Sequence, residues 1–250
     1  MSKFVDKLRN LSKPSTSIGF HPAASKAKNS PMLLIAGLLG EDVKEAEAVA
    51  NSNVDAGLLL SQSLSTKDVK QVVRTMGDIP LGVFLKDMSK EKAAKFADSG
   101  CDFVVFDMRM PIALMQEGGI GKFLLAESSL DSGLVRAINA LDIDGVLINC
   151  VEESFITVEY LLTCQRFSEL ANKPLLTILP SLPTNIELGN LWKAGIDGVV
   201  IPPMQAAEAF VELRKAIDNL PREVKRRQGK VAAMLPHYGD SGTIDEEEEI

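Results

Sequence analysis

Four segments of the chain repeat one short pattern, and this repetition constrains the fold more than any other feature of the sequence. Each segment has an aspartate, usually a small residue next, and then a run of apolar residues. The segments are VDAGLLL from Val54, CDFVVFD from Cys101, IDGVLIN from Ile143 and IDGVVIP from Ile196. Aliphatic runs without polar alternation are typical of strands buried on both faces. The pattern therefore predicts four buried strands that begin in the same way.

Four further apolar runs lie between these segments: PMLLIAG from Pro31, PLGVFLK from Pro80, KFLLAES from Lys122 and PLLTILP from Pro174. Stretches of helical period separate the runs, and capping-box spacing opens two of them, at Ser65 and Thr184. Strand–helix units that follow one another predict parallel strands, and eight such units predict a single closed (β/α)8 TIM barrel. The alternative is an open doubly wound sheet, which would need a glycine-rich phosphate turn or a clear edge strand.

The two ends of the chain differ from the repeated part. Residues 3–12 form a predicted amphipathic helix, with Phe4, Val5, Leu8 and Leu11 on one face, and we expect it to cover the bottom or the side of the barrel. We place the barrel with this helix in residues 1–228. Residues 229–250 end in DSGTIDEEEEI and are predicted to be a flexible, disordered acidic tail, which serves solubility or binds a partner.

Composition excludes several classes of protein. The formal net charge is −7, and no dense basic stripe occurs outside Arg222–Lys230, so we expect no nucleic-acid partner. No apolar stretch is long enough for a membrane span or a signal peptide, which predicts a cytoplasmic protein without a membrane partner. Three cysteines without a CxxC motif and two histidines near opposite ends favour neither a disulfide framework nor a metal site. No organic cofactor is implied.

Function in a barrel of this kind lies at the carboxyl ends of the strands. The candidate catalytic residues there are Lys86, Asp107 and Glu127, and the candidate substrate contacts are Asn149, Arg109, Ser128 and Ser181. A partly desolvated lysine has a lowered pKa, which suits acid–base chemistry. Each candidate also has a structural alternative: a lysine–aspartate pair for Lys86, capping for Asp107 and Asn149, and a salt bridge at the rim for Glu127.

The segment AGIDGVVIP resembles the A-D-G-V-V-V-G-S ending of the ribulose-phosphate-binding barrels. IPLGVFLKD resembles the third strand of indole-3-glycerol-phosphate synthase within that group. In that family the lysine is the general acid, a glutamate on strand five assists catalysis and an asparagine on strand six contacts substrate. The resemblance implies these roles for Lys86, Glu127 and Asn149, although Asn149 stands two residues later than the family spacing.

Prolines occupy the loops that bind phosphate in that family. The family has a Ser/Gly-rich turn after strand seven and Gly-Ser after strand eight, whereas this chain has Pro180 and Pro183, and then Pro202 and Pro203. A phosphate site needs backbone N–H donors, and proline has none. The family's charged pair on strand one is also absent from LLIAGLLG. We therefore expect a ligand that is not held by a phosphate group in the usual way.

These observations predict a small-molecule enzyme of lyase or isomerase type. Lys86 would act as acid and base on a carbonyl or anionic substrate, and Asp107 or Glu127 would assist it. The alternative is a non-catalytic TIM barrel that has lost the phosphate cup and serves binding or assembly. The sequence leaves open whether the chain forms a homo-oligomer.

Overall fold

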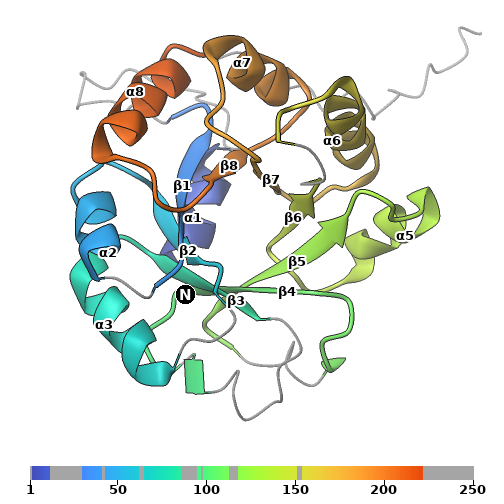
Figure 1. Cartoon of the computed structure of the whole chain (residues 1–250). Coiled ribbons are helices and arrows are strands. Elements are labelled where there is room, and N and C mark those ends of the chain that lie inside the picture. Colours follow the sequence, from blue (N-terminus) through green and yellow to red (C-terminus); the bar gives the residue numbers. More distant parts are fainter. Residues whose placement is uncertain are drawn as a thin grey trace, which may run out of the picture.

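The computed structural model describes residues 2–11, 30–40, 43–61, 65–85, 95–96, 98–112, 118–150 and 154–221. Eight parallel strands form a closed barrel in sequence order, and the last strand pairs with the first (Figure 1). The strands are β1 (Leu33–Leu38), β2 (Ala56–Leu59), β3 (Leu81–Leu85), β4 (Phe103–Phe106), β5 (Gly121–Glu127), β6 (Gly145–Asn149), β7 (Leu175–Ile178) and β8 (Gly198–Ile201). The predicted (β/α)8 barrel is confirmed.

Helices lie around the outside of the barrel, except for the first, which lies at one end of it (Figure 1). They are α1 (Lys3–Leu11), α2 (Val43–Ala50), α3 (Thr66–Met76), α5 (Ser132–Ala137) with the short 3₁₀ helix η2 (Ile138–Ala140), α6 (Val158–Leu170), α7 (Asn185–Lys193) and α8 (Ala207–Asp218). Both predicted capping boxes are present, at Ser65 with Asp68 and at Thr184 with Glu187. The stretch expected to form a helix after the third strand lies largely outside the described residues.

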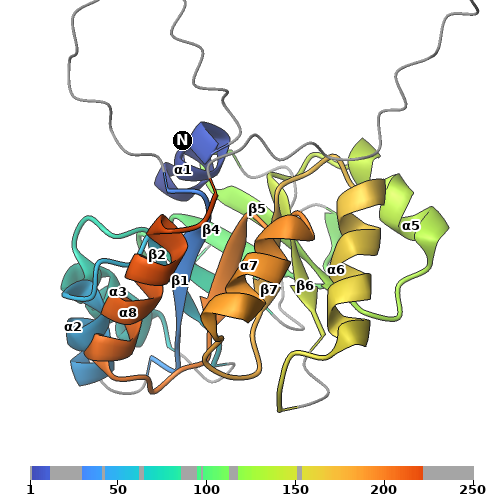
Figure 2. The same cartoon turned by 90° about the horizontal axis from the view of Figure 1, so that it is seen from above.

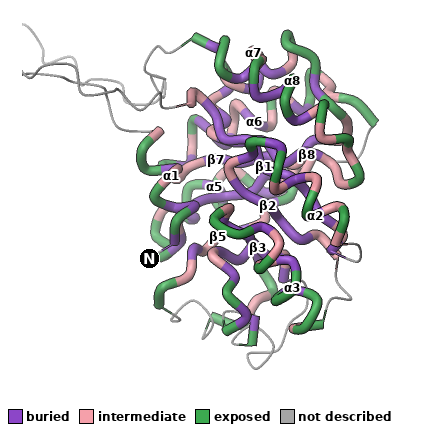
Figure 3. The backbone as a smooth tube through the Cα atoms, turned by 90° about the vertical axis from the view of Figure 1, so that its left-hand side faces the viewer, coloured by how far each residue is buried: buried purple, intermediate pink, exposed green. Residues whose placement is uncertain are grey.

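Side chains on each strand point alternately into the barrel and toward the helices. The buried apolar residues accordingly form two clusters, one between sheet and helices and one inside the barrel. Figure 3 shows burial concentrated in the strands, with exposed positions on the helices. On β4, for example, Phe103 and Val105 belong to the inner cluster, whereas Val104 and Phe106 belong to the outer one. This alternation allows each residue at a strand end to be assigned to the interior or the exterior.

Helix α1 closes the end of the barrel where the strands begin (Figure 2). Its apolar face is buried in the inner cluster, and Phe4 stacks on Phe103 with ring centroids 4.4 Å apart. Phe123 completes the aromatic group, 5.4 Å from Phe4. Gly82 makes room for these rings, because a Cβ atom there would lie 2.2 Å from the ring of Phe103. The predicted amphipathic helix is therefore confirmed, and it covers the bottom of the barrel.

The four repeated aspartates form turns at this end of the barrel, as expected of residues without a catalytic role. Three carboxylates accept the N–H of a residue near the start of the preceding strand: Asp55 from Leu34, Asp144 from Lys122 and Asp197 from Leu175, at 2.8, 3.0 and 2.8 Å. Asp102 differs, because its carboxylate accepts from Ser2 Oγ and from the N–H groups of Lys3 and Phe4. Asp102 therefore fixes the start of α1.

Some sequence predictions fall outside the described residues. The expected acidic tail, residues 229–250, and the basic run Arg222–Lys230 belong to this group. Within the described part of the chain, no helix has the length and apolar character that crossing a bilayer requires.

Candidate active site

The barrel interior is less deeply buried at the carboxyl ends of its strands, opposite α1. Four apolar side chains of the inner cluster are only partly buried near this end: Leu60, Phe84, Leu125 and Ile178. These four side chains pack against the fully buried residues of the inner cluster. An apolar floor at the carboxyl end of a barrel is the place where such proteins bind small molecules. We call this region the mouth.

Two predicted site residues lie side by side at the mouth, and a third lies at the end of the neighbouring strand. Glu127 and Asn149 end β5 and β6 and are register partners, so their side chains point to the same face of the sheet. Each stands two positions beyond an interior side chain of its own strand and therefore continues the row that faces the barrel axis. Asp107 follows β4 in the same way. The structure thus makes Glu127 and Asn149 neighbours, whereas Asp107, one step past the Phe106–Leu124 pair, lies lower in the barrel than Glu127.

The two carboxylates have different surroundings. Glu127 is exposed, and its carboxylate has no hydrogen-bond or ion-pair partner among the described residues. Asp107 is half-buried, and its Oδ1 accepts the N–H of Arg109 at 2.9 Å. Part of the Asp107 carboxylate therefore holds the turn after β4, a structural role that differs from the helix capping considered from the sequence. Glu127 is the more available of the two for a ligand.

The remaining predicted contacts lie at different distances from this group. Ser128 follows Glu127 directly and is half-buried; its N–H donates to the Asn149 carbonyl at 3.2 Å. Arg109 is exposed on the turn after β4, and Ser181 is half-buried in the loop after β7. Lys86, the predicted acid–base residue, lies outside the described residues. Of these residues, Ser128 adjoins Glu127 and Asn149, and Arg109 contacts Asp107 through its backbone N–H.

Arg166 was missed by the sequence reasoning. Its Nη2 donates to the Ser128 carbonyl at 2.5 Å, and its Nε is buried without a hydrogen-bond partner among the described residues. This arginine comes from the middle of α6 and fixes the backbone beside Glu127. A single arginine in a helical pattern gives no signal of such a contact, because 38 positions separate it from Ser128.

Two of the three cysteines are buried and unreactive. Burial raises the pKa of the Cys101 thiol to about 12, and burial also raises the pKa of Cys164. Both thiols are therefore neutral at physiological pH, and only a thiolate is reactive. Cys150 lies half-buried beside Asn149. Among the described residues, no group of three histidine, cysteine, aspartate or glutamate side chains could hold a metal ion.

These buried thiols predict a loss of stability in alkali. An unfolded thiol titrates near pH 9.0, whereas folded Cys101 titrates at a pKa of about 12. Between these values unfolding releases a proton, so the free energy of unfolding falls as pH rises, by about 1.4 kcal/mol per pH unit for each such thiol. Urea unfolding from pH 8 to 11 should show a steeper decline for the wild type than for Cys101→Ala. Equal slopes would contradict the burial of this thiol.

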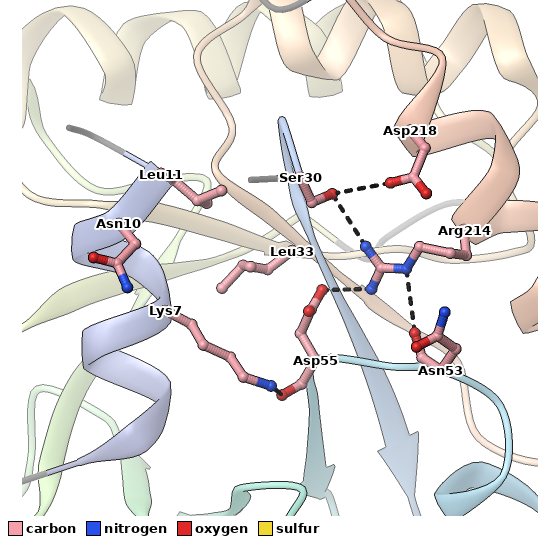
Figure 4. Close-up of a pocket in the computed structure, with 9 residues that line it drawn as sticks. All are labelled: Lys7, Asn10, Leu11, Ser30, Leu33, Asn53, Asp55, Arg214 and Asp218. Atoms are coloured by element: carbon pink, nitrogen blue, oxygen red, sulfur yellow. Dashed lines mark hydrogen bonds and ion pairs between the residues drawn. The ribbon is translucent and has the colours of Figure 1, made fainter. Parts of the chain in front are cut away.

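A second pocket lies at the opposite end of the barrel and was not predicted (Figure 4). It measures about 330 Å³ and lies between α1, the starts of β1 and β2, and the end of α8. Buried Arg214 donates to Asp55 Oδ2 at 2.5 Å, to Ser30 Oγ at 3.1 Å and to the Asn53 carbonyl at 3.2 Å. Lys7 Nζ donates to the Asp55 carbonyl at 2.7 Å, and burial lowers the pKa of Lys7. Both cations that line this pocket therefore bind groups of the chain itself.

Comparison with known proteins places the fold. The α-subunit of tryptophan synthase from Legionella pneumophila aligns with a TM-score of 0.64 at 16% identity. The alignment covers 88% of this chain and 100% of the α-subunit. A mutant α-subunit from Pyrococcus furiosus aligns with a TM-score of 0.58 at 15% identity, over 75% of this chain and 97% of that one. The chain shares the (β/α)8 fold of these α-subunits.

A third structure, from the α2β2 tryptophan synthase complex of P. furiosus, aligns with a TM-score of 0.58 at 14% identity, over 76% of this chain and 98% of that one. No family model and no curated protein sequence matches this chain. At these identities the likeness concerns the fold alone, which agrees with the resemblance inferred from the strand sequences.

Proposed function

We propose that this barrel is a small-molecule enzyme of lyase or isomerase type, with its active site at the mouth. The observation that carries the proposal is the pairing of Glu127 with Asn149 on axis-facing positions, above the apolar floor that includes Leu125. A carboxylate without a partner among the described residues can transfer a proton, and an amide can hold a carbonyl or anionic oxygen. An apolar floor with a few converging polar groups suits a small organic ligand.

Lys86 is the proposed acid–base partner of Glu127. It stands two positions after Phe84, an interior side chain at the top of β3, and so has the sequence spacing of the axis-facing row. In the proposed reaction one of the two groups removes a proton next to a carbonyl, and the other returns a proton to the product or to the leaving group. Asp107 orients Lys86. Arg109, Ser128 and Ser181 contact the substrate together with Asn149, and no cofactor takes part.

A thermal-shift screen tests this proposal. Carbonyl and carboxylate metabolites are screened against the wild type, Lys86→Met and Glu127→Gln, with Glu159→Gln as the matched control on the exposed face of α6. We expect compounds that raise the Tm of the wild type and of the control by several degrees, and that fail to do so in the two mouth variants. If no compound shifts the wild type, or if all four proteins shift equally, the mouth is not the site.

A second candidate function is a non-catalytic barrel that assembles with copies of itself. Exposed apolar residues occur at the starts of α6 and α7. These two helices are neighbours on the outside of the barrel (Figure 1). The exposed residues are Phe155, Val158 and Leu162 at α6, and Leu182 and Ile186 at α7. Val158 and Ile186 are 73% and 77% exposed, which is unusual for large apolar residues grouped on a monomer. We call these residues the α6–α7 face.

Light scattering after gel filtration tests this candidate. We expect the wild type to be a dimer and Leu162→Glu to be a monomer, because a carboxylate at the centre of an apolar interface is costly. Val211→Glu introduces the same charge at an exposed apolar position of α8 and should leave the dimer intact. A monomeric wild type would eliminate assembly through this face. A dimer for which the screen finds no ligand would favour assembly over catalysis.

A further inference from the structure

Glu45 connects two loops at the mouth. It lies in the first turn of α2, and its carboxylate accepts two backbone hydrogen bonds, one on each oxygen. Oε2 accepts from the N–H of Leu39, just after β1, and Oε1 accepts from the N–H of Met204, after β8, both at 3.0 Å. Since β1 and β8 are neighbours in the barrel, the two donors come from adjacent loops. Two N–H groups thus converge on one anionic group of the chain itself.

The backbone around this contact is closely packed and unusual. Met204 has a φ of +63°, a conformation that is strained for a residue with a side chain. Gly37, near the end of β1, allows the close approach of β8, because a Cβ atom there would lie 2.6 Å from the Ile201 carbonyl oxygen. Pro202 and Pro203 have no N–H, so Met204 is the first residue after β8 that can donate one. Glu45 takes this first donor.

The loop after β7 is closed in a similar way. Thr184 gives its N–H to Glu187 Oε2 at 2.7 Å, and its hydroxyl accepts from the N–H of Glu187, so the start of α7 is capped by its own residues. In TIM barrels that bind phosphate, the loops after strands seven and eight supply the backbone donors for the phosphate group. Here the donors at Thr184 and Met204 are bound to glutamates of the chain.

We infer that Glu45 is a built-in anion that occupies the donors of the loop after β8, so that the mouth selects ligands without a phosphate group on this side. As a statement about substrate class, this inference rests on the proposed function. The contact itself does not depend on catalysis. The contact gives a physical account of the prolines after β8. Pro202 and Pro203 remove two N–H groups from the loop, and Glu45 accepts the N–H of the following residue, Met204.

Removing the carboxylate tests the inference, because Glu45→Ala leaves two converging N–H groups without an acceptor. The Tm of this variant is measured in phosphate, in acetate and in chloride at equal ionic strength. We expect the variant to be less stable than the wild type in chloride and to recover in phosphate or acetate. The wild type should show only the general effect of each salt on stability. The matched control is Glu47→Ala, at an exposed position of the same helix, and it should behave as the wild type.

Three outcomes would overturn the inference: phosphate stabilising the wild type as much as Glu45→Ala, Glu47→Ala responding as Glu45→Ala does, or no response to anions in Glu45→Ala. If Glu45→Ala does not fold, Glu45→Gln replaces it. That variant keeps one acceptor oxygen and should show a smaller phosphate response that still exceeds the response of the control. The experiment uses inorganic phosphate and acetate without substrate. A failed ligand screen would therefore refute the proposed enzyme and leave this result standing.

Discussion

Phe4→Ala should lower the free energy of unfolding by about 3–5 kcal/mol, the usual loss when a buried phenylalanine is truncated. Phe4 is fully buried, stacks on Phe103 and contacts Phe123. Its removal leaves a void at the bottom of the barrel, where the neighbouring rings are held by the strands and cannot fill it. Urea unfolding followed by circular dichroism gives the value.

The matched control for this prediction is Asp6→Ala, an exposed position of the same helix. We expect a change within about 0.5 kcal/mol for this control, as for most surface substitutions. A loss for Phe4→Ala no greater than that of the control would show that α1 does not close the barrel. Asp102→Ala gives an independent check, because its carboxylate binds the first N–H groups of α1 and should also reduce stability.

Arg214→Met should destabilise the protein to a similar extent, by about 3–5 kcal/mol, as is typical when one partner of a buried ion pair is removed. The guanidinium of Arg214 binds Asp55, Ser30 and the Asn53 carbonyl, and the residue is 9% exposed. Methionine fills much of the same volume but leaves the Asp55 carboxylate with one donor among the described residues, the backbone N–H of Leu34. The measurement is again urea unfolding.

Lys215→Met is the control for Arg214→Met, since Lys215 is the next residue on α8 and is exposed. It should change stability little. Raising the salt concentration should not reproduce the effect of Arg214→Met, because a buried pair is screened far less than a surface pair. If both variants have equal stabilities, the hydrogen bonds of Arg214 do not hold α8 to β1 and β2.

The sequence allowed the barrel to be predicted because its signals are local. Each strand is a short apolar run, and the opening aspartates, such as Asp55 and Asp144, mark where four of them begin. The amphipathic face around Phe4 showed that the first helix is buried on one side. It could not show which end of the barrel the helix covers, since periodicity identifies a face and not its partner.

The candidate site was predicted in part for the same reason. The spacing within one strand already places Asp107 and Asn149 on the same kind of position, and the register of β5 and β6 brings Glu127 beside Asn149. Contacts between distant segments left no local trace. Glu45 and Met204 are 159 positions apart, and so are Asp55 and Arg214. Only the closed barrel, in which the last strand pairs with the first, brings these residues together.

A crystal structure with a compound from the thermal-shift screen tests the central claim most directly. We predict that the compound lies on the apolar floor of the mouth, within hydrogen-bond distance of the Glu127 carboxylate and the Asn149 amide, with Lys86 facing it. A compound bound instead in the pocket beside Lys7 and Arg214, or on the α6–α7 face, would contradict the account. So would a Lys86 side chain that points away from Asp107 and Glu127 into solvent.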